Sequence, residues 1–310
     1  MYPHFLSPPE ETLGVIPPPW GVTPNFVNPA SLAPIVLITN ICFPLTSALF
    51  VTLRLYTTGF VTRTVGIDDY AIIISWFSAC VASSVNSLLT RYGLGRHLWD
   101  VPFSTYNPNF LKYAVIWRTF YYLSLMLSKL SILVLYSRYL PEKLSKAITT
   151  TIVVVILYSL IALFQWLFAC QPIEKYWDLR IISGSCVDLG KFNVFIGLMN
   201  TATDVVILLL PIGMLRKVRL PRQEKIGVVL GLMTGGFVLG VSVIRLKTTF
   251  DSAAGLDLTW DWVRNGIWWI IEMHTAIVCA CLPVGRAFLR KHFPNIVGYN
   301  FHTASQGPPG

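Results

Sequence analysis

Residues 147–167 read AITTTIVVVILYSLIALFQWL, an apolar stretch with no charged side chain. A helix that rises about 1.5 Å per residue needs about 20 residues to cross the hydrocarbon core of a bilayer. Six further stretches of similar length are nearly as apolar, and they lie at residues 33–53, 70–89, 113–136, 192–215, 226–244 and 262–282. The sequence therefore predicts seven transmembrane helices.

The composition supports an all-α, polytopic membrane protein. The chain is 54% hydrophobic and 13% charged, whereas soluble domains are about 25% charged. The apolar stretches are too long, and alternate too little, to be strands of a membrane barrel. We expect one transmembrane domain at residues 33–291, with a Pro-rich segment at 1–32 before it and a short tail at 292–310 after it.

The distribution of basic residues indicates the orientation. Residues 1–32 contain no Lys or Arg, and the first base, Arg54, follows the first span. The short loop after the fifth span is rich in bases, which favour the cytosolic side. We therefore expect the N-terminus outside, the C-terminus in the cytosol, and a location in the plasma membrane or the endoplasmic reticulum. Because the bases that give the net charge of +9 lie in loops between spans, we expect the lipid bilayer as a partner and no nucleic acid.

Two cysteines flank the loop between the fourth and fifth spans. Cys170 and Cys186 fall on the predicted outer side, where the environment is oxidising, so they are expected to form a disulfide. No C-x-x-C spacing occurs in the sequence, and we expect no metal site.

Ionisable and amide side chains inside the spans are the candidate functional residues. Such groups are costly in a membrane and usually pair with one another. Arg118 and Lys129 are separated by three helical turns and share one face of the 113–136 span. Asn193, Asn200 and Asp204 form a single stripe on the 192–215 span.

Glu272 and Arg245 complete this set. With the depth of Glu272 counted from residue 267, Glu272 and Arg118 both lie about 7–8 Å below the outer ends of their spans, whereas Asp204 and Lys129 lie deeper. We expect Lys129 to pair with Asp204, and Glu272 to pair with Arg118 or Arg245. The prediction is a polar pocket that opens toward the outer leaflet, with an ion pair at its base.

A purely structural interpretation stands beside this one. Buried ion pairs also fix the register of helices without binding any ligand. For Lys129 and Asp204 we favour the structural role over a chemical one. For Glu272 and Arg118 we favour neither role over the other. Three other features are expected to be structural: Asp68 and Asp69 as helix caps, the Trp-rich run at 260–269 as an interfacial belt, and His274 in packing or at the lipid interface.

A set of motifs spread along the chain carries a family likeness. The motifs are Arg54 with Asp68-Asp69-Tyr70, Gly93-x-Gly95-Arg96-His97, Lys129-Leu130-Ser131-Ile132 with Tyr136 and Arg138, Cys170-x-Pro172 with Trp177 and Cys186, Asn200-x-x-x-Asp204 with Pro211, Arg245, and Pro283. Over residues 33–291 the chain resembles the fungal seven-helix "rhodopsin domain" family, which includes a member of the satratoxin biosynthetic cluster. The resemblance implies a filamentous-fungal membrane protein and a secondary-metabolite setting.

Two departures narrow what the resemblance implies. A retinal opsin needs a lysine in its seventh helix, and none lies between Arg264 and Arg286, so we expect no retinal and no other cofactor. Receptor-like relatives can carry a cysteine-rich module ahead of the first helix, but residues 1–32 contain no cysteine. Together with the short C-terminal tail, these departures favour a function carried out inside the helix bundle over a receptor role.

Two functions remain open at the level of sequence. The first is a protein that binds or senses a lipophilic small molecule of a secondary-metabolite pathway. The alternative is an intramembrane acid–base enzyme, a cyclase or isomerase acting on a polyketide or terpenoid, with Glu272 or Asp204 as the acid and Arg118 or Lys129 as the stabilising cation. Transport is less favoured, because the sequence shows no inverted repeat or paired broken helices.

Overall fold

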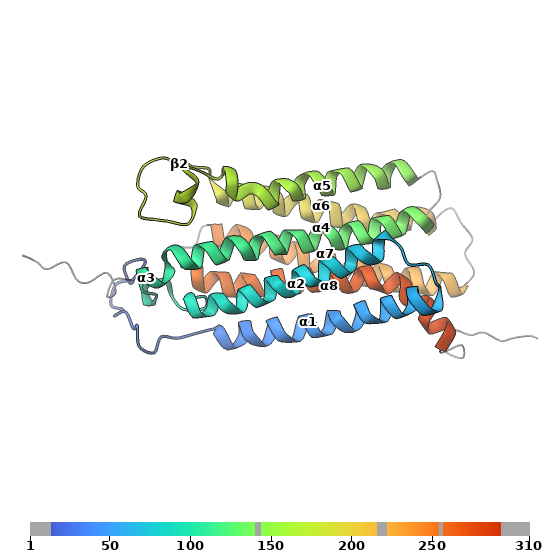
Figure 1. Cartoon of the computed structure of the whole chain (residues 1–310), viewed down its shortest axis with the longest axis horizontal. Helices are drawn as coiled ribbons and strands as arrows, with labels where there is room; N and C mark the ends of the chain where they lie inside the picture. The colour runs from blue at the N-terminus through green and yellow to red at the C-terminus, as the bar shows by residue number, and fades with distance from the viewer. Residues whose placement is uncertain (1–13, 140–143, 216–221, 254–256, 293–310) are drawn as a thin grey trace, which may run out of the picture.

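The structure, a computed structural model, describes residues 14–139, 144–215, 222–253 and 257–292. Seven long helices run along its long axis (Figure 1), and they are α1 (Ala33–Tyr56), α2 (Ile67–Leu89), α4 (Leu111–Tyr139), α5 (Ser145–Phe168), α6 (Leu189–Leu215), α7 (Arg222–Ala253) and α8 (Leu258–His292). Among the described residues, six of these helices are long and apolar enough to cross a membrane, and α7 is a continuous helix of 32 residues beside them. The prediction of an all-α membrane protein is confirmed.

The helices extend beyond the apolar stretches because a helix does not end where the hydrocarbon core ends. Helix α8 extends past its predicted span at both ends, since it begins at Leu258, four residues before that span, and ends at His292, ten residues after it. The remaining elements are short: α3 (Phe103–Thr105), the strands β1 (Cys170–Gln171) and β2 (Ser185–Cys186), and single turns between helices.

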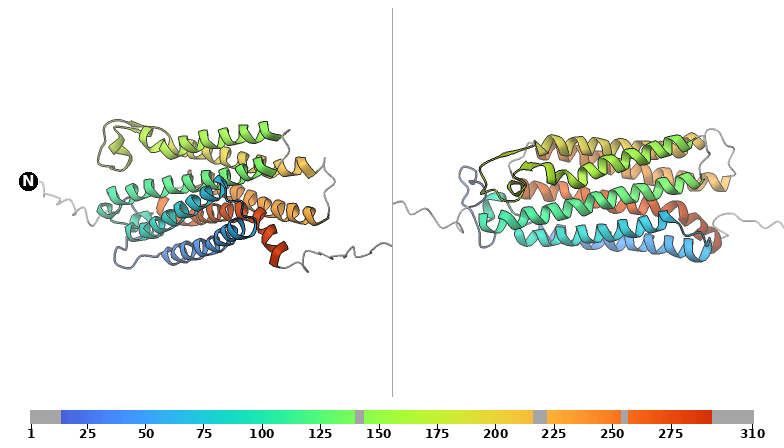
Figure 2. Two further views of the ribbon diagram at one scale, coloured as in Figure 1. Left: turned by 45° about the vertical axis from the view of Figure 1, so that its right-hand side comes forward. Right: turned by 45° about the horizontal axis from the view of Figure 1, so that its top comes forward.

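The order of the helices places α4 and α8 in the middle of the bundle. Figures 1 and 2 show α1 along one side and α5 with α6 along the opposite side. Helix α4 packs against α2, α5 and α8, and α8 packs against α7, α1 and α4. Side chains on the inner faces of α4 and α8 can therefore meet those of α6 and α7.

The outward faces of the bundle are apolar, as a bilayer requires. On α1, Ile38, Ile41, Leu45 and Leu49 are each at least 60% exposed and follow one another at helical spacing. On α5 the exposed apolar side chains include Phe168. A soluble protein rarely exposes such continuous apolar surface, so these faces indicate contact with lipid.

One end of the bundle is covered by ordered connections, and we assign it to the extracytosolic side from the distribution of bases. The segment before α1 lies on the loop after α2: Val15 N donates to Val101 O (3.2 Å), and Asn25 N donates to Asp100 Oδ1 (2.8 Å). At the same end (Figure 1), β1 and β2 carry the disulfide between Cys170 and Cys186. The predicted disulfide is confirmed.

The glycine-containing loop after α2 fixes the start of α8. His97 lies between Trp99 and Trp260, with ring centroids 4.4 and 4.0 Å away, and its Nδ1 contacts Oδ2 of Asp257 at 2.5 Å. Gly95 has a φ of 88°, a left-handed conformation that favours glycine. The motif around His97 therefore anchors the outer end of α8.

Removal of the disulfide is expected to destabilise the outer end of the bundle. A bridge across 16 residues of chain contributes about 3 kcal/mol by restricting the unfolded chain. The double variant Cys170→Ser/Cys186→Ser should therefore unfold at a lower temperature in detergent than the wild type. Cys42→Ser, which removes an exposed free thiol, is the control and should change little. An unchanged unfolding temperature in the double variant would contradict a stabilising bond.

Candidate functional site

A cavity of about 410 Å³ lies between α4, α6, α7 and α8 in the outer half of the bundle. Its volume falls within the roughly 300–1,000 Å³ typical of small-molecule pockets. The walls are mostly apolar and aromatic, and their aromatic side chains include Trp117, Tyr121, Tyr122, Trp262 and Trp269. Tyr176, in the turn after β1, lines the cavity from the loop that carries the disulfide.

Three tryptophans form a packed cluster on one wall of this cavity. The ring centroid of Trp117 lies 5.1 Å from that of Trp269 and 5.3 Å from that of Trp262. Trp262 and Trp269 are seven residues apart and so lie on one face of α8. The prediction of an interfacial belt is wrong for these two residues, because they line a cavity inside the bundle. The seven-residue spacing was the signal in the sequence that could have identified them.

Three of the predicted pocket residues also line the cavity: Arg118, Asn193 and Arg245. Nη1 of Arg118 donates to the hydroxyl of Tyr176 at 3.0 Å. Arg245 is only 4% exposed, and its Nε lies 2.5 Å from Oε2 of Glu272. The cavity therefore combines aromatic walls with a few convergent polar groups, the usual composition of a ligand site.

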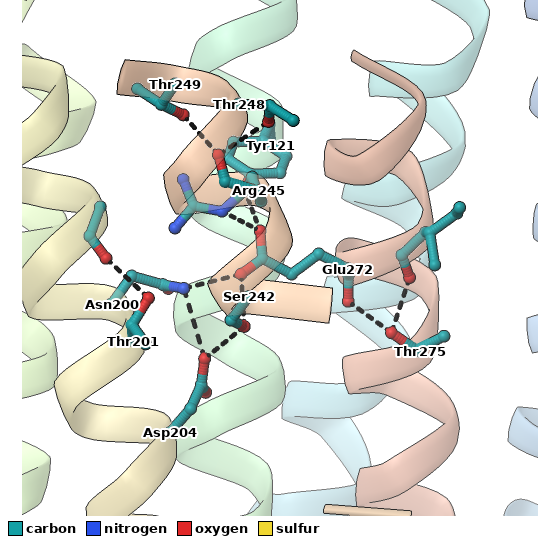
Figure 3. Close-up of polar contacts among 12 residues, drawn as sticks. Tyr121, Asn200, Thr201, Asp204, Ser242, Arg245, Thr248, Thr249, Glu272 and Thr275 are labelled. Atoms are coloured by element: carbon teal, nitrogen blue, oxygen red, sulfur yellow. Dashed lines mark hydrogen bonds and ion pairs between the residues drawn. The ribbon is translucent and has the colours of Figure 1, made fainter. Parts of the chain in front are cut away.

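Glu272 lies below the cavity, behind Arg245, and is 1% exposed. Figure 3 shows its carboxylate between Arg245 and Ser242. Besides the ion pair with Arg245, it accepts hydrogen bonds from Tyr121 Oη (2.7 Å), Asn200 Nδ2 (2.8 Å) and Ser242 Oγ (2.7 Å). Each of its two oxygens thus has two partners.

A second ion pair lies deeper and is linked to the first. Lys129 Nζ lies 2.9 Å from Oδ1 of Asp204 and donates to Oδ1 of Asn200 at 2.9 Å. Ser242 Oγ lies within hydrogen-bond distance of both Asp204 and Glu272. Two cations and two carboxylates therefore form one connected network across α4, α6, α7 and α8. The predicted pairing of Lys129 with Asp204 is present.

Helix starts explain why Glu272 pairs with Arg245 and not with Arg118. Because α8 begins at Leu258, Glu272 lies 14 residues, or about 21 Å, from the outer end of its helix. Arg118 lies seven residues, or about 10 Å, from the start of α4. The predicted shallow depth of Glu272 is wrong, because it was counted from residue 267, where the apolar run begins.

The predicted site residues consequently divide into two groups. Arg118, Asn193 and Arg245 line the cavity, whereas Lys129, Asn200, Asp204 and Glu272 belong to the network beneath it. Lys129 and Asp204 border a separate space of about 50 Å³.

A third charged cluster joins α1, α2, α4 and α8 at the end of the bundle that lies away from the cavity. Arg54 contacts Asp68 (2.6 Å) and Asp69 (2.9 Å) and donates to the carbonyl of Ala280 (2.6 Å). Arg138 also pairs with Asp68, at 2.9 Å. Asp69 Oδ2 accepts from the backbone N–H of Gly66, so the predicted capping role applies to Asp69. For Asp68 the structure shows ion pairs instead.

His274 is a packing residue of the bundle rather than a group at the lipid interface. Its ring nitrogens contact the hydroxyls of Ser47 (2.9 Å) and Ser83 (3.2 Å), and it is 1% exposed. Within the described part of the chain, no group of three or more His, Cys, Asp or Glu side chains could hold a metal ion.

Three relatives align with most of the chain. They are a polyenoic acids biosynthesis gene cluster protein of Metarhizium anisopliae (28% identical; 80% of this chain, 71% of the relative), a wortmanamides biosynthesis cluster protein of Talaromyces wortmannii (26%; 74% and 63%) and the receptor GIN3 of Arthrobotrys oligospora (23%; 89% and 67%). The aligned part thus spans about two thirds of the length of these relatives.

The family follows from a match that covers most of the transmembrane domain. Residues 53–291 match the model of the fungal rhodopsin domain, and this range holds the cavity, the buried network and the charged cluster of Arg54. The chain belongs to the fungal rhodopsin domain family.

Proposed function

We propose that this protein binds a lipophilic small molecule in the outer cavity and works as a binding or sensing protein of a secondary-metabolite pathway, in the plasma membrane or the endoplasmic reticulum. The observation that carries the proposal is the cavity of about 410 Å³ with a wall of three packed tryptophans. Apolar walls with a small number of polar groups favour ligands that are largely apolar. Two of the relatives described above are named for biosynthetic clusters and the third is named a receptor.

The acid–base alternative has less support. A general acid must reach its substrate with a proton to give. Glu272 is not among the residues that line the cavity, and both of its oxygens are occupied by donors. Asp204 lies deeper and is paired with Lys129. Neither carboxylate lines the outer cavity.

Filling the cavity is the direct test of this proposal. Ala114, on α4, is buried and lines the cavity, so Ala114→Phe should exclude a ligand by taking up its volume. We expect a lipophilic compound to co-purify with the wild type from the native fungus and to be lost, or reduced at least about tenfold, in Ala114→Phe. Solvent extraction followed by mass spectrometry of equal amounts of folded protein is the measurement.

The matched control is Ala202→Phe, which adds the same side chain at an exposed position of α6. This variant should retain the compound at the level of the wild type. If the wild type and Ala114→Phe carry the same compounds in the same amounts, the outer cavity is not the binding site and the proposal fails.

A further inference from the structure

The guanidinium of Arg245 is only partly used by the protein. Its Nε faces Glu272, but its Nη2, which is buried, has no hydrogen-bond partner in the described part of the chain. A buried charged donor without an acceptor is costly, and native structures rarely leave one unpaired. Because Arg245 lines the cavity, a bound ligand could supply the missing acceptor.

Arg118 adds a second cation to the same cavity. Its partner in the described residues is the neutral hydroxyl of Tyr176, and no described carboxylate lies within ion-pair distance of it. The indole N–H groups of Trp262 and Trp269 are likewise buried without an acceptor. Among the described buried atoms of the cavity lining that lack a partner, these donors outnumber the single acceptor, Oδ1 of Asn193.

The acidic side chains near the cavity do not balance these donors. Glu272 is shared among four partners below the cavity. Asp261 lines the cavity but lies three residues from the start of α8, about 5 Å along the helix, whereas Arg245 lies eight residues, about 12 Å, from the end of α7. A carboxylate at the rim and guanidinium groups deeper inside favour a ligand whose anionic end points inward.

We propose that the ligand is a lipophilic carboxylic acid, bound as its anion, with the carboxylate held by Arg245 and Arg118 and the apolar chain against the tryptophan cluster. This inference rests on the function proposed above and names its ligand class. Guanidinium groups match the geometry of a carboxylate and bind it through two hydrogen bonds. A single negative charge suits the cavity better than a dianionic phosphate, because Glu272 already neutralises one of the two arginines.

The test compares two probes that differ only in the head group, 11-bromoundecanoate and 11-bromoundecanol. The bromine atom quenches tryptophan fluorescence, and three tryptophans line the cavity, so quenching reports occupancy in protein reconstituted into lipid nanodiscs. Because Ala114→Phe fills the cavity, the quenching that remains in this variant comes from probe dissolved in the lipid, and it is subtracted from the wild-type signal. At a pH where the acid is ionised, we expect the wild type to bind the acid at least about tenfold more tightly than the alcohol, since hydrogen bonds to a charged group are strong.

Two variants should weaken binding of the acid to about the level of the alcohol and so remove this preference. Arg118→Met breaks no ion pair in the described residues. Arg245→Met is combined with Glu272→Gln so that no buried charge is left unpaired. Lys247→Met removes the same charge from an exposed position of α7, and this control should keep the preference for the acid.

The outcomes separate the two proposals. Equal binding of acid and alcohol, both blocked by Ala114→Phe, would overturn the assignment of a carboxylate and leave the binding cavity intact. Unchanged acid preference in both arginine variants would overturn the assignment of Arg118 and Arg245. Quenching by both probes that Ala114→Phe does not reduce would overturn the proposed function itself.

Discussion

Replacement of Arg54 by methionine is expected to destabilise the folded protein by about 3–5 kcal/mol, the cost of breaking a buried ion pair by removing one partner. The guanidinium of Arg54 is 1% exposed and contacts Asp68, Asp69 and the carbonyl of Ala280. Its loss leaves three buried acceptors without this partner at the junction of α1, α2 and α8. The expected result is a large fall in the abundance of folded protein, measured by size-exclusion chromatography of a fluorescent fusion.

Arg138 provides the matched comparison, because it pairs with the same Asp68 from a side chain that is 40% exposed. An exposed pair is screened by solvent, so Arg138→Met should cost about 1 kcal/mol or less. Arg54→Lys should be intermediate, because an ammonium group cannot reproduce the forked geometry that reaches all three acceptors. Equal abundance of Arg54→Met and Arg138→Met would show that burial does not set the strength of this cluster.

The transmembrane architecture was predictable because a bilayer restricts the possible structures severely. A helix that crosses the membrane must be long and apolar. From that rule the sequence identified the six helices that qualify among the described residues, and also the stretch that forms part of α7. The pairing of Lys129 with Asp204 was also accessible, since both residues lie deep within apolar spans and neither is stable there alone. Length, depth and charge were sufficient for these predictions.

Rotation about a helix axis and the true start of a helix were not predictable in the same way. Tryptophan is favourable both at the membrane interface and in a packed interior, so residue type alone did not place Trp262 inside the bundle, and only its seven-residue spacing from Trp269 pointed to a shared helix face. The charged and polar residues between 258 and 266 hid the true start of α8, and this error put Glu272 too close to the outer surface. The choice between Arg118 and Arg245 as its partner depended on that depth.

Asp68 illustrates a third limit. A carboxylate at the start of a helix is usually a cap, and Asp69 fulfils that role toward Gly66. Asp68 instead meets Arg54 and Arg138, which come from two other helices. Contacts between segments that are distant in the chain depend on the packing of the whole bundle, and a local pattern cannot report them.

The substitution Glu272→Gln separates a structural role from a catalytic one. A glutamine keeps the shape of the side chain but leaves Arg245 as a buried cation without its counter-ion, at a cost of about 3–5 kcal/mol. We therefore expect less folded protein. The molecules that do fold should still bind ligand, and no single pathway precursor should accumulate. Co-substitution with Arg245→Met should restore much of the abundance, because it removes the unpaired charge.

A catalytic role predicts a different result for the same variant. If Glu272 delivers a proton to a substrate, Glu272→Gln should insert at normal levels and cause one specific precursor to accumulate, as deletion of the gene would. Deletion of a binding or sensing protein should instead change the amounts of all the metabolites of the pathway together. Glu272 makes four contacts within the bundle. If its role is structural, losing the charge should lower the abundance of folded protein and should not block a single reaction. Normal abundance of Glu272→Gln together with one accumulated precursor would therefore overturn the binding role.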